Sequence, residues 1–130
     1  MSDAFHVDCP ARVVLDHVTS RWAVLILTGV RDGPLRFSEL HAKIEGISEK
    51  MLAKTLRTLA GDGLIVRTVY PSTPPMVSYG LTELGDGITQ LLHGLMSWIG
   101  AHAADVHAAQ TANREGASPG DAQPLATASP

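Results

Sequence analysis

The sequence predicts a mainly α fold with one small β-hairpin, arranged as a winged helix-turn-helix with a dimer formed by the terminal helices. Two short helical segments are joined by the tight turn Glu45-Gly46-Ile47. A stretch rich in β-branched residues, 64–70, is followed by the loop PSTPP and a second short stretch, 76–81. Two helices joined by a short glycine-containing turn and followed by a hairpin are typical of a winged helix-turn-helix.

The first two helices follow from capping residues and apolar content. Pro10 suits the first turn of a helix, and Asp8 or Cys9 would cap it. Ser20 precedes residues 21–30, which are apolar almost all round and therefore indicate a central core helix. That helix would end before Gly33-Pro34, and residues 35–37 would be short and extended.

The remaining helices show similar start signals. Ser38 is expected to cap a third helix that runs through Ile44, and Ser48 to cap a fourth that ends near Gly61. Thr82 would cap the last helix. Its large apolar residues are Ile88, Leu91, Leu92, Leu95, Trp98 and Ile99.

Length and composition indicate one domain of residues 1–104 and a tail of residues 105–130. The tail is rich in Ala, Ser and Pro, buries too little apolar surface to offset its chain entropy, and is expected to be disordered. No apolar run approaches the roughly 20 residues of a membrane span, and no secretory signal opens the chain. A single cysteine excludes an intramolecular disulfide framework, so a cytoplasmic location is expected.

The segment ISEKMLAKTLRTL, residues 47–59, concentrates positive charge in a chain whose net charge is −3. At about 100° per residue, three leucines fall on one face of the helix and three cations on the opposite face. These are Leu52, Leu56 and Leu59, and Lys50, Lys54 and Arg57. Residues 36–67 hold six basic and four acidic side chains, a local balance of +2.

A basic stripe is often only a solvated face, but its place between a glycine turn and a hairpin favours double-stranded DNA as the partner. The three cations would contact phosphates, Ser48, Met51 and Thr55 would face the major groove, and other basic or hydroxyl groups would hold the backbone. The candidate DNA-binding residues are Arg36, Ser48, Lys50, Met51, Lys54, Thr55, Arg57, Arg67, Ser72 and Thr73.

The first and last helices carry more apolar surface than a small domain needs, although these residues could instead only close the monomer core. Two recognition helices about one DNA turn apart, roughly 34 Å, require a dimer, so an isologous homodimer is expected. The candidate interface residues are Val14, Val18, Leu91, Leu95, Trp98 and Ile99.

Residues 9–98 resemble the HxlR-type winged-helix transcriptional regulators of bacteria. The resemblance rests on the Cys-Pro start, Arg-Trp before the core helix, GPLRFSEL, GIS-x-KML, L-x-x-L-x-x-DGL-x-x-R, YP-x-x-PP-x-V-x-Y and LTELG. It implies a sequence-specific homodimeric regulator that binds a palindromic operator through residues 48–60, with a wing near residues 70–76. The family commonly has a cation at the position of Met76 and an acid at Ser78, whereas the wing tip STPPM is uncharged.

Cys9 is a candidate redox site, because the positive end of a helix favours a thiolate and Arg12 would add to that field. The resemblance implies a response to oxidants or electrophiles through this cysteine. With no second cysteine in the chain, oxidation would join two chains or add a small thiol. The alternative is a half-buried small residue without a signalling role.

The sequence gives little evidence for a metal site, a cofactor or an enzymatic activity. The six histidines show no metal-ligand spacing, so neither a metal site nor a cofactor is expected, and no catalytic constellation suggests an enzyme. Two alternatives remain open. One is a winged-helix module for protein–protein contact, and the other is a regulator switched by a small molecule in a dimer cleft near Trp22 and Trp98.

Overall fold

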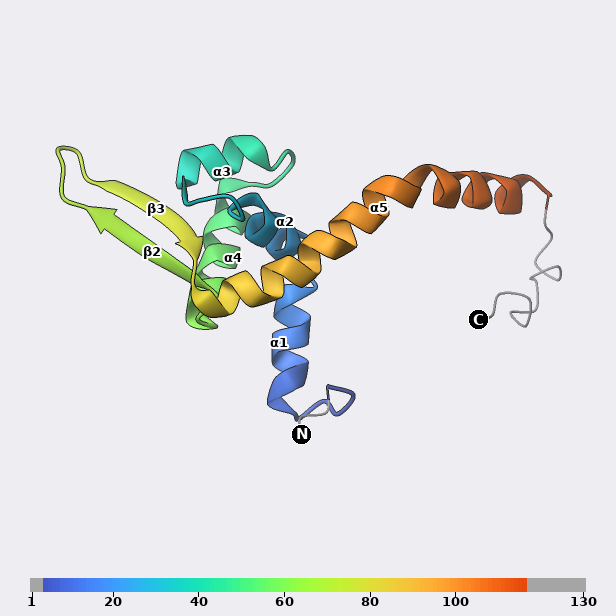
Figure 1. Ribbon diagram of the computed structural model, residues 1–130, viewed down its shortest axis with the longest axis horizontal. Helices are drawn as coiled ribbons and strands as arrows, with labels where there is room; N and C mark the ends of the chain where they lie inside the picture. The colour runs from blue at the N-terminus through green and yellow to red at the C-terminus, as the bar shows by residue number, and fades with distance from the viewer. Residues whose placement is uncertain (1–3, 117–130) are drawn as a thin grey trace. The chain divides into compact units, whose positions relative to one another are not determined.

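The computed structural model describes residues 4–116 and shows five helices and three strands in that range (Figure 1). The helices are α1 (Pro10–Val18), α2 (Arg21–Gly29), α3 (Phe37–Lys43), α4 (Glu49–Gly61) and α5 (Glu83–Gly116). The strands are β1 (Leu35–Arg36), β2 (Ile65–Tyr70) and β3 (Met76–Leu81). The chain divides into two compact units, Met1–Gly94 and Leu95–Pro130, and α5 contributes to both.

The winged helix-turn-helix lies within the first unit and confirms the predicted mainly α fold with a small hairpin, whereas the dimer of terminal helices stays a prediction. The three strands form one antiparallel sheet in the order β1-β3-β2. The β2–β3 hairpin pairs from Ile65 with Leu81 to Tyr70 with Met76, and it projects beyond the helices as a wing (Figure 1). The short strand β1 pairs with β3 and connects the sheet to the start of α3.

Side-chain caps at three predicted positions start three of the helices. The Ser20 hydroxyl accepts a hydrogen bond from the Ala23 N–H at 3.2 Å, and the Ser48 hydroxyl accepts one from Met51 at 3.0 Å. Thr82 accepts one from the Gly85 N–H at 2.9 Å. Such caps satisfy backbone donors that have no partner within the helix, so these sequence signals set the helix starts.

The core is aliphatic, as the low aromatic content predicts. Helix α2 lies at its centre, and the buried faces of α3 and α4 pack around it. The largest fully buried apolar side chains of the core are Ile26, Leu27, Val30, Leu40, Leu52, Leu56 and Leu59.

The first turn of α5 docks closely on the turn between α4 and β2. The Thr82 N–H donates to the Leu64 carbonyl at 3.1 Å, and the Thr82 hydroxyl donates to the Gly63 carbonyl at 2.6 Å. A Cβ placed on Gly85 would overlap the Leu64 carbonyl oxygen, so only glycine fits at this contact. Thr82 and Gly85 thereby hold the first turn of α5 against the turn that follows α4.

Two expectations about helix limits are wrong. Helix α3 begins at Phe37, before Ser38, because the Arg36 N–H donates to the Glu39 carboxylate at 2.7 Å and this contact caps the helix. Helix α5 continues to Gly116, so residues 105–116 are helical where disorder was expected. Half of its twelve residues are strong helix formers, namely Ala108, Ala109, Gln110, Ala112, Arg114 and Glu115. The rest of the expected tail, residues 117–130, lies outside the described residues.

Within the described residues, none of the helices combines the length and the apolar content that crossing a membrane requires.

The close contact at Gly85 leads to a stability prediction. Gly85→Ala should lower the free energy of unfolding by about 1–3 kcal/mol, because the added methyl forces α5 away from Leu64. Urea denaturation at fixed protein concentration measures the loss. Gly87→Ala is the matched control in the same helix. Nothing lies within 4 Å of its Cβ position, so it should be neutral or stabilising by up to about 1 kcal/mol. Equal effects of the two substitutions would contradict the close contact.

Candidate nucleic-acid interface

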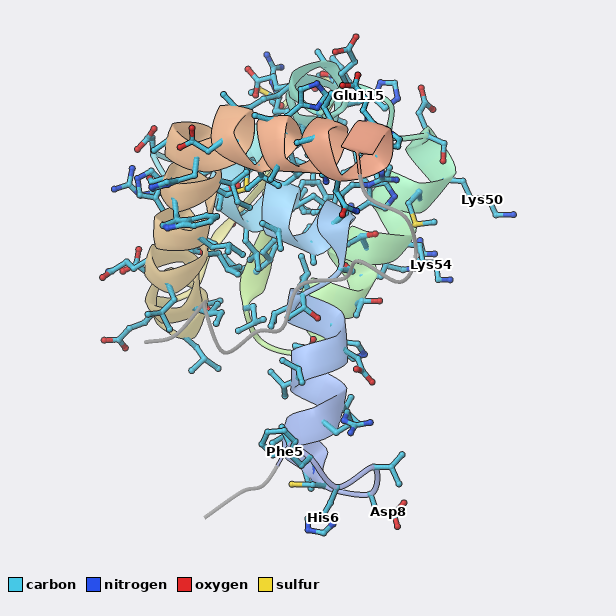
Figure 2. The ribbon with its side chains drawn as sticks, turned by 90° about the vertical axis from the view of Figure 1, so that its right-hand side faces the viewer. Phe5, His6, Asp8, Lys50, Lys54 and Glu115 are labelled. Carbon is cyan, nitrogen blue, oxygen red and sulfur yellow. The ribbon has the colours of Figure 1, made fainter. Side chains whose placement is uncertain are left out.

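Helix α4 presents its cations to solvent because its leucines are buried. Leu52 and Leu59 are 0 % exposed and Leu56 is 2 % exposed, which confirms the predicted inner face. The cations Lys50, Lys54 and Arg57 are exposed, and Figure 2 shows Lys50 and Lys54 pointing away from the helix. Among residues 4–116, none of these three cations forms an ion pair. They are therefore available to an anionic partner.

Both ends of α4 are held in place. Ser48 caps its start. At its end, Asp62 occupies the C-cap position, and its carboxylate lies 2.7 Å from His17 Nδ1 of α1. The pair is partly exposed, so its contribution to stability is modest, but it ties α1 to the end of α4.

The flank of α4 that was expected to face base edges is partly covered. Met51 is 37 % exposed, whereas Thr55 and Thr58 are half-buried in a hollow that Ser20 also lines. The Thr55 hydroxyl donates to the Met51 carbonyl at 2.8 Å, so its proton is used within the helix. Met51 is therefore more accessible than Thr55 and Thr58.

A second hollow lies between α4 and the sheet, with a volume of about 260 Å³. Arg57 of α4, Arg67 of β2 and Tyr79 of β3 line it. Arg67 pairs directly with Tyr79 across the two strands, and directly opposite residues place their side chains on the same face of a sheet. Two guanidinium groups beside a phenol can donate several hydrogen bonds to one anion.

Tyr79 was missed as a candidate site residue. Its signal was the alternation of the predicted strand 76–81, which puts residues 77, 79 and 81 on one face. The strand partner of Tyr79 depends on the register of the hairpin, which the residue pattern alone does not supply.

Arg36 is less available than expected. It immediately precedes α3, and its Nε lies 3.8 Å from the Glu39 carboxylate. Since Glu39 partly neutralises the guanidinium, a phosphate would have to compete with that carboxylate. Both groups are about half exposed, so the ion pair is weak.

The wing tip departs from the expectation for its hydroxyl groups. The Ser72 hydroxyl donates to the Pro74 carbonyl at 2.6 Å, and a hydroxyl has only one proton to donate. Ser72 therefore cannot donate to a phosphate in this conformation, whereas Thr73 lies exposed beside it. The strand ends are apolar and open, with Val69, Tyr70 and Met76 between 42 % and 49 % exposed.

Most of the candidate dimer residues expose apolar surface. Val14 of α1 is 47 % exposed and Leu91 of α5 is 72 % exposed. In the second unit, the exposed fractions of Leu95, Trp98 and Ile99 lie between 43 % and 55 %. Val18 was wrongly included, because at 5 % exposure it belongs to the core of its own chain.

Cys9 occupies the N-cap position of α1 and is half-buried. Its side chain makes no capping hydrogen bond. The guanidinium of Arg12 donates to the carbonyls of Ala4 (2.8 Å) and Phe5 (3.2 Å), so it folds the preceding turn against the helix start. The cysteine thus lies in an ordered turn, at the positive end of a helix.

No candidate metal site lies among the residues that the structure describes. There, no group of three or more His, Cys, Asp or Glu residues is arranged to hold a metal ion.

The sequence model of the HxlR-like helix-turn-helix family matches residues 17–107. The HTH-type transcriptional regulator YtfH of Escherichia coli K12 is 49 % identical over 102 residues, which cover 78 % of this chain and 81 % of YtfH. The structure of the transcriptional regulator ytfH from Salmonella typhimurium aligns with a TM-score of 0.80 at 46 % identity, over 85 % of this chain and 99 % of that one. The redox regulator HypR in its oxidized form aligns with a TM-score of 0.67 at 32 % identity, over 72 % and 96 % of the two chains.

The cap of α4 can be tested by substitution. Ser48→Ala should lower the free energy of unfolding by about 1 kcal/mol, because the Met51 N–H loses its partner. Thermal or urea denaturation measures the change. The control is Ser38→Ala, which lies in the exposed first turn of α3 without a capping role and should change stability by less than about 0.5 kcal/mol. A silent Ser48→Ala would mean that the cap does not stabilise α4.

Proposed function

The chain belongs to the HxlR-like helix-turn-helix family and is a transcriptional regulator of that type, and we propose that it binds a palindromic operator in double-stranded DNA as a homodimer through α4. One observation carries the proposal. Opposite a fully buried leucine stripe, α4 presents Lys50, Lys54 and Arg57 as exposed cations without ion pairs among the described residues. Cations held in this way on a helix that follows a helix-turn-helix turn match the requirements of major-groove docking.

The proposed contacts divide by chemistry. The three cations of α4 bind phosphates, which fixes the position of the helix without reading sequence. Ser48 and Met51, in the first turn, lie where a recognition helix contacts base edges, and a methionine side chain can pack against a thymine methyl. Thr55 contributes its methyl and acceptor lone pairs, since its hydroxyl proton is already used.

Phosphate contact near the wing is assigned to the hollow of Arg57, Arg67 and Tyr79. Because the wing tip is uncharged and the Ser72 proton is engaged, the guanidinium groups at the base of the wing are the stronger donors. Thr73 remains a hydroxyl donor at the tip, and Arg36 is a weaker contact that competes with Glu39.

The homodimer is supported by the apolar surface that α1 and α5 expose, which includes Val14, Leu91, Leu95, Trp98 and Ile99. Exposed apolar side chains on a helix suit contact with a second chain, and twofold symmetry would bring two α4 helices to successive major grooves about 34 Å apart. A cytoplasmic location fits a DNA-binding regulator with one cysteine, and no catalytic role is proposed.

A second candidate function is a redox response through Cys9. The observations that favour it are the place of Cys9 at the start of α1 and the structural similarity to the redox regulator HypR. Oxidation would join Cys9 to a thiol of another chain or to a small thiol. A covalent bond at the start of α1 would alter the helix that we assign to the dimer seam.

Two alternative functions, a protein-contact module and a regulator switched by a small molecule, are outcomes that the tests can reveal. The open apolar strand ends at Val69, Tyr70 and Met76 would suit a protein partner. A small-molecule effector would need a site near Trp22 or Trp98, and quenching of tryptophan fluorescence by the compound would reveal it.

The phosphate role of Lys54 predicts a change in salt dependence. Lys54→Ala should weaken binding to specific and random duplexes alike and flatten the slope of log K against log salt concentration by about one unit. Fluorescence anisotropy with the duplex upstream of the protein's own gene measures both effects. Lys43→Ala is the control, because Lys43 lies on α3 and its Nζ donates to the Gly29 carbonyl at 2.9 Å.

The salt dependence distinguishes DNA binding through Lys54 from the alternative of a protein-contact module. An unchanged slope for Lys54→Ala would remove Lys54 from the phosphate contacts. If the unmodified protein binds no duplex even at low salt, the protein-contact reading replaces the proposed function.

The redox proposal predicts that diamide weakens DNA binding by roughly tenfold, a typical coupling between two sites, and that dithiothreitol restores it. Cys9→Ser should bind DNA normally and ignore diamide, because serine is a good helix cap and has no thiol. Anisotropy measures the affinity, and a non-reducing gel detects two joined chains. If diamide weakens Cys9→Ser equally, then Cys9 is not the sensor.

A further inference from the structure

Arg21 is an exposed cation at the start of α2 that is stacked on its neighbour. Its guanidinium carbon lies 4.2 Å from the centroid of a Trp22 ring. This contact is a cation–π interaction, and it holds a flexible side chain in one orientation. A side chain that is already ordered loses less conformational entropy when it binds a partner.

The stacking leaves the hydrogen-bond donors of Arg21 unused. The cation–π contact is made with the ring as a whole, and the guanidinium carries five N–H groups in one plane. Among residues 4–116, Arg21 forms no ion pair and donates no side-chain hydrogen bond. A planar fork of unpaired donors matches the oxygen atoms of a phosphate group.

The residues on both sides of Arg21 lie beside the helix-turn-helix. Trp22 Cη2 is 3.9 Å from the position that a Cβ of Gly46 would occupy, in the turn before α4. Ser20 lines the same surface hollow as Met51 and Lys54 of α4. The start of α2 is therefore adjacent to the first turns of the DNA-reading helix.

We propose that Arg21, held in place by Trp22, binds a DNA phosphate and extends the interface from α4 to the start of α2. The proposal rests on the proposed function, because it requires DNA along the exposed face of α4. Trp22 acts as a positioning residue, since it orients Arg21 and also lies beside Gly46 in the turn before α4. The base sequence is not read by this contact, because a phosphate carries no sequence information.

The test uses the full chain, the labelled duplex upstream of its own gene and a random duplex of equal length. Fluorescence anisotropy at several salt concentrations gives the slope of log K against log salt concentration for each variant. Arg21→Ala should flatten the slope by about one unit on both duplexes, because one phosphate contact is lost. Arg21→Lys should keep the slope of the unmodified protein, because the charge is kept.

Arg31→Ala is the matched control. Arg31 is also an exposed arginine, but it lies beyond the other end of α2 and forms an ion pair with Asp32 at 3.6 Å. Its removal should leave the slope unchanged. Circular dichroism and thermal denaturation of each variant show whether the fold is kept.

The possible results are distinct. An unchanged slope for Arg21→Ala, together with a flattened slope for Lys54→Ala, would overturn this inference and leave the proposed function intact. A slope that falls equally for Arg21→Lys and Arg21→Ala would show that the structure of α2, rather than the charge, is responsible, and would also overturn it. Absence of DNA binding by the unmodified protein would overturn both proposals.

Discussion

The rest of the structure depends on the burial of the leucine stripe of α4. Leu52, Leu56 and Leu59 are almost completely excluded from solvent, so rotation of α4 about its axis would expose apolar surface and bury charge. Because a helix repeats every 3.6 residues, that burial directs Lys50 and Lys54 outward. The same helix therefore supplies part of the core and the charged face that we assign to DNA.

Much of this arrangement could be predicted from local signals. The caps at Ser20, Ser48 and Thr82 are properties of single turns, and the leucine spacing of α4 is a property of one helix. Such signals act within a few residues, so they can be recognised in the sequence without knowledge of the tertiary structure. The order of the elements then identified the winged helix-turn-helix.

The sequence predictions are wrong at positions where another group in the folded chain takes the hydrogen bond or covers the side chain. Ser38 is the predicted cap, but the Glu39 carboxylate accepts a hydrogen bond from the Arg36 N–H, and the helix begins earlier, at Phe37. Ser72 looked like a phosphate donor, but a carbonyl in its own loop takes the proton. Val18 has the apolar character of an interface residue, and only its packing shows that its own chain covers it. Composition suggested disorder after residue 104, whereas the alanines there favour a helix as far as Gly116.

The concentration of positive charge on a small part of an acidic chain affects how such a regulator would find its target. Binding to arbitrary DNA depends on the number of phosphates that are neutralised, and the net charge of −3 weakens the overall attraction of the chain to DNA. A weaker attraction to arbitrary DNA would leave a larger share of the protein free in solution. Under this view, a small number of copies per cell would keep the operator occupied, because little of the protein is lost to competing sites.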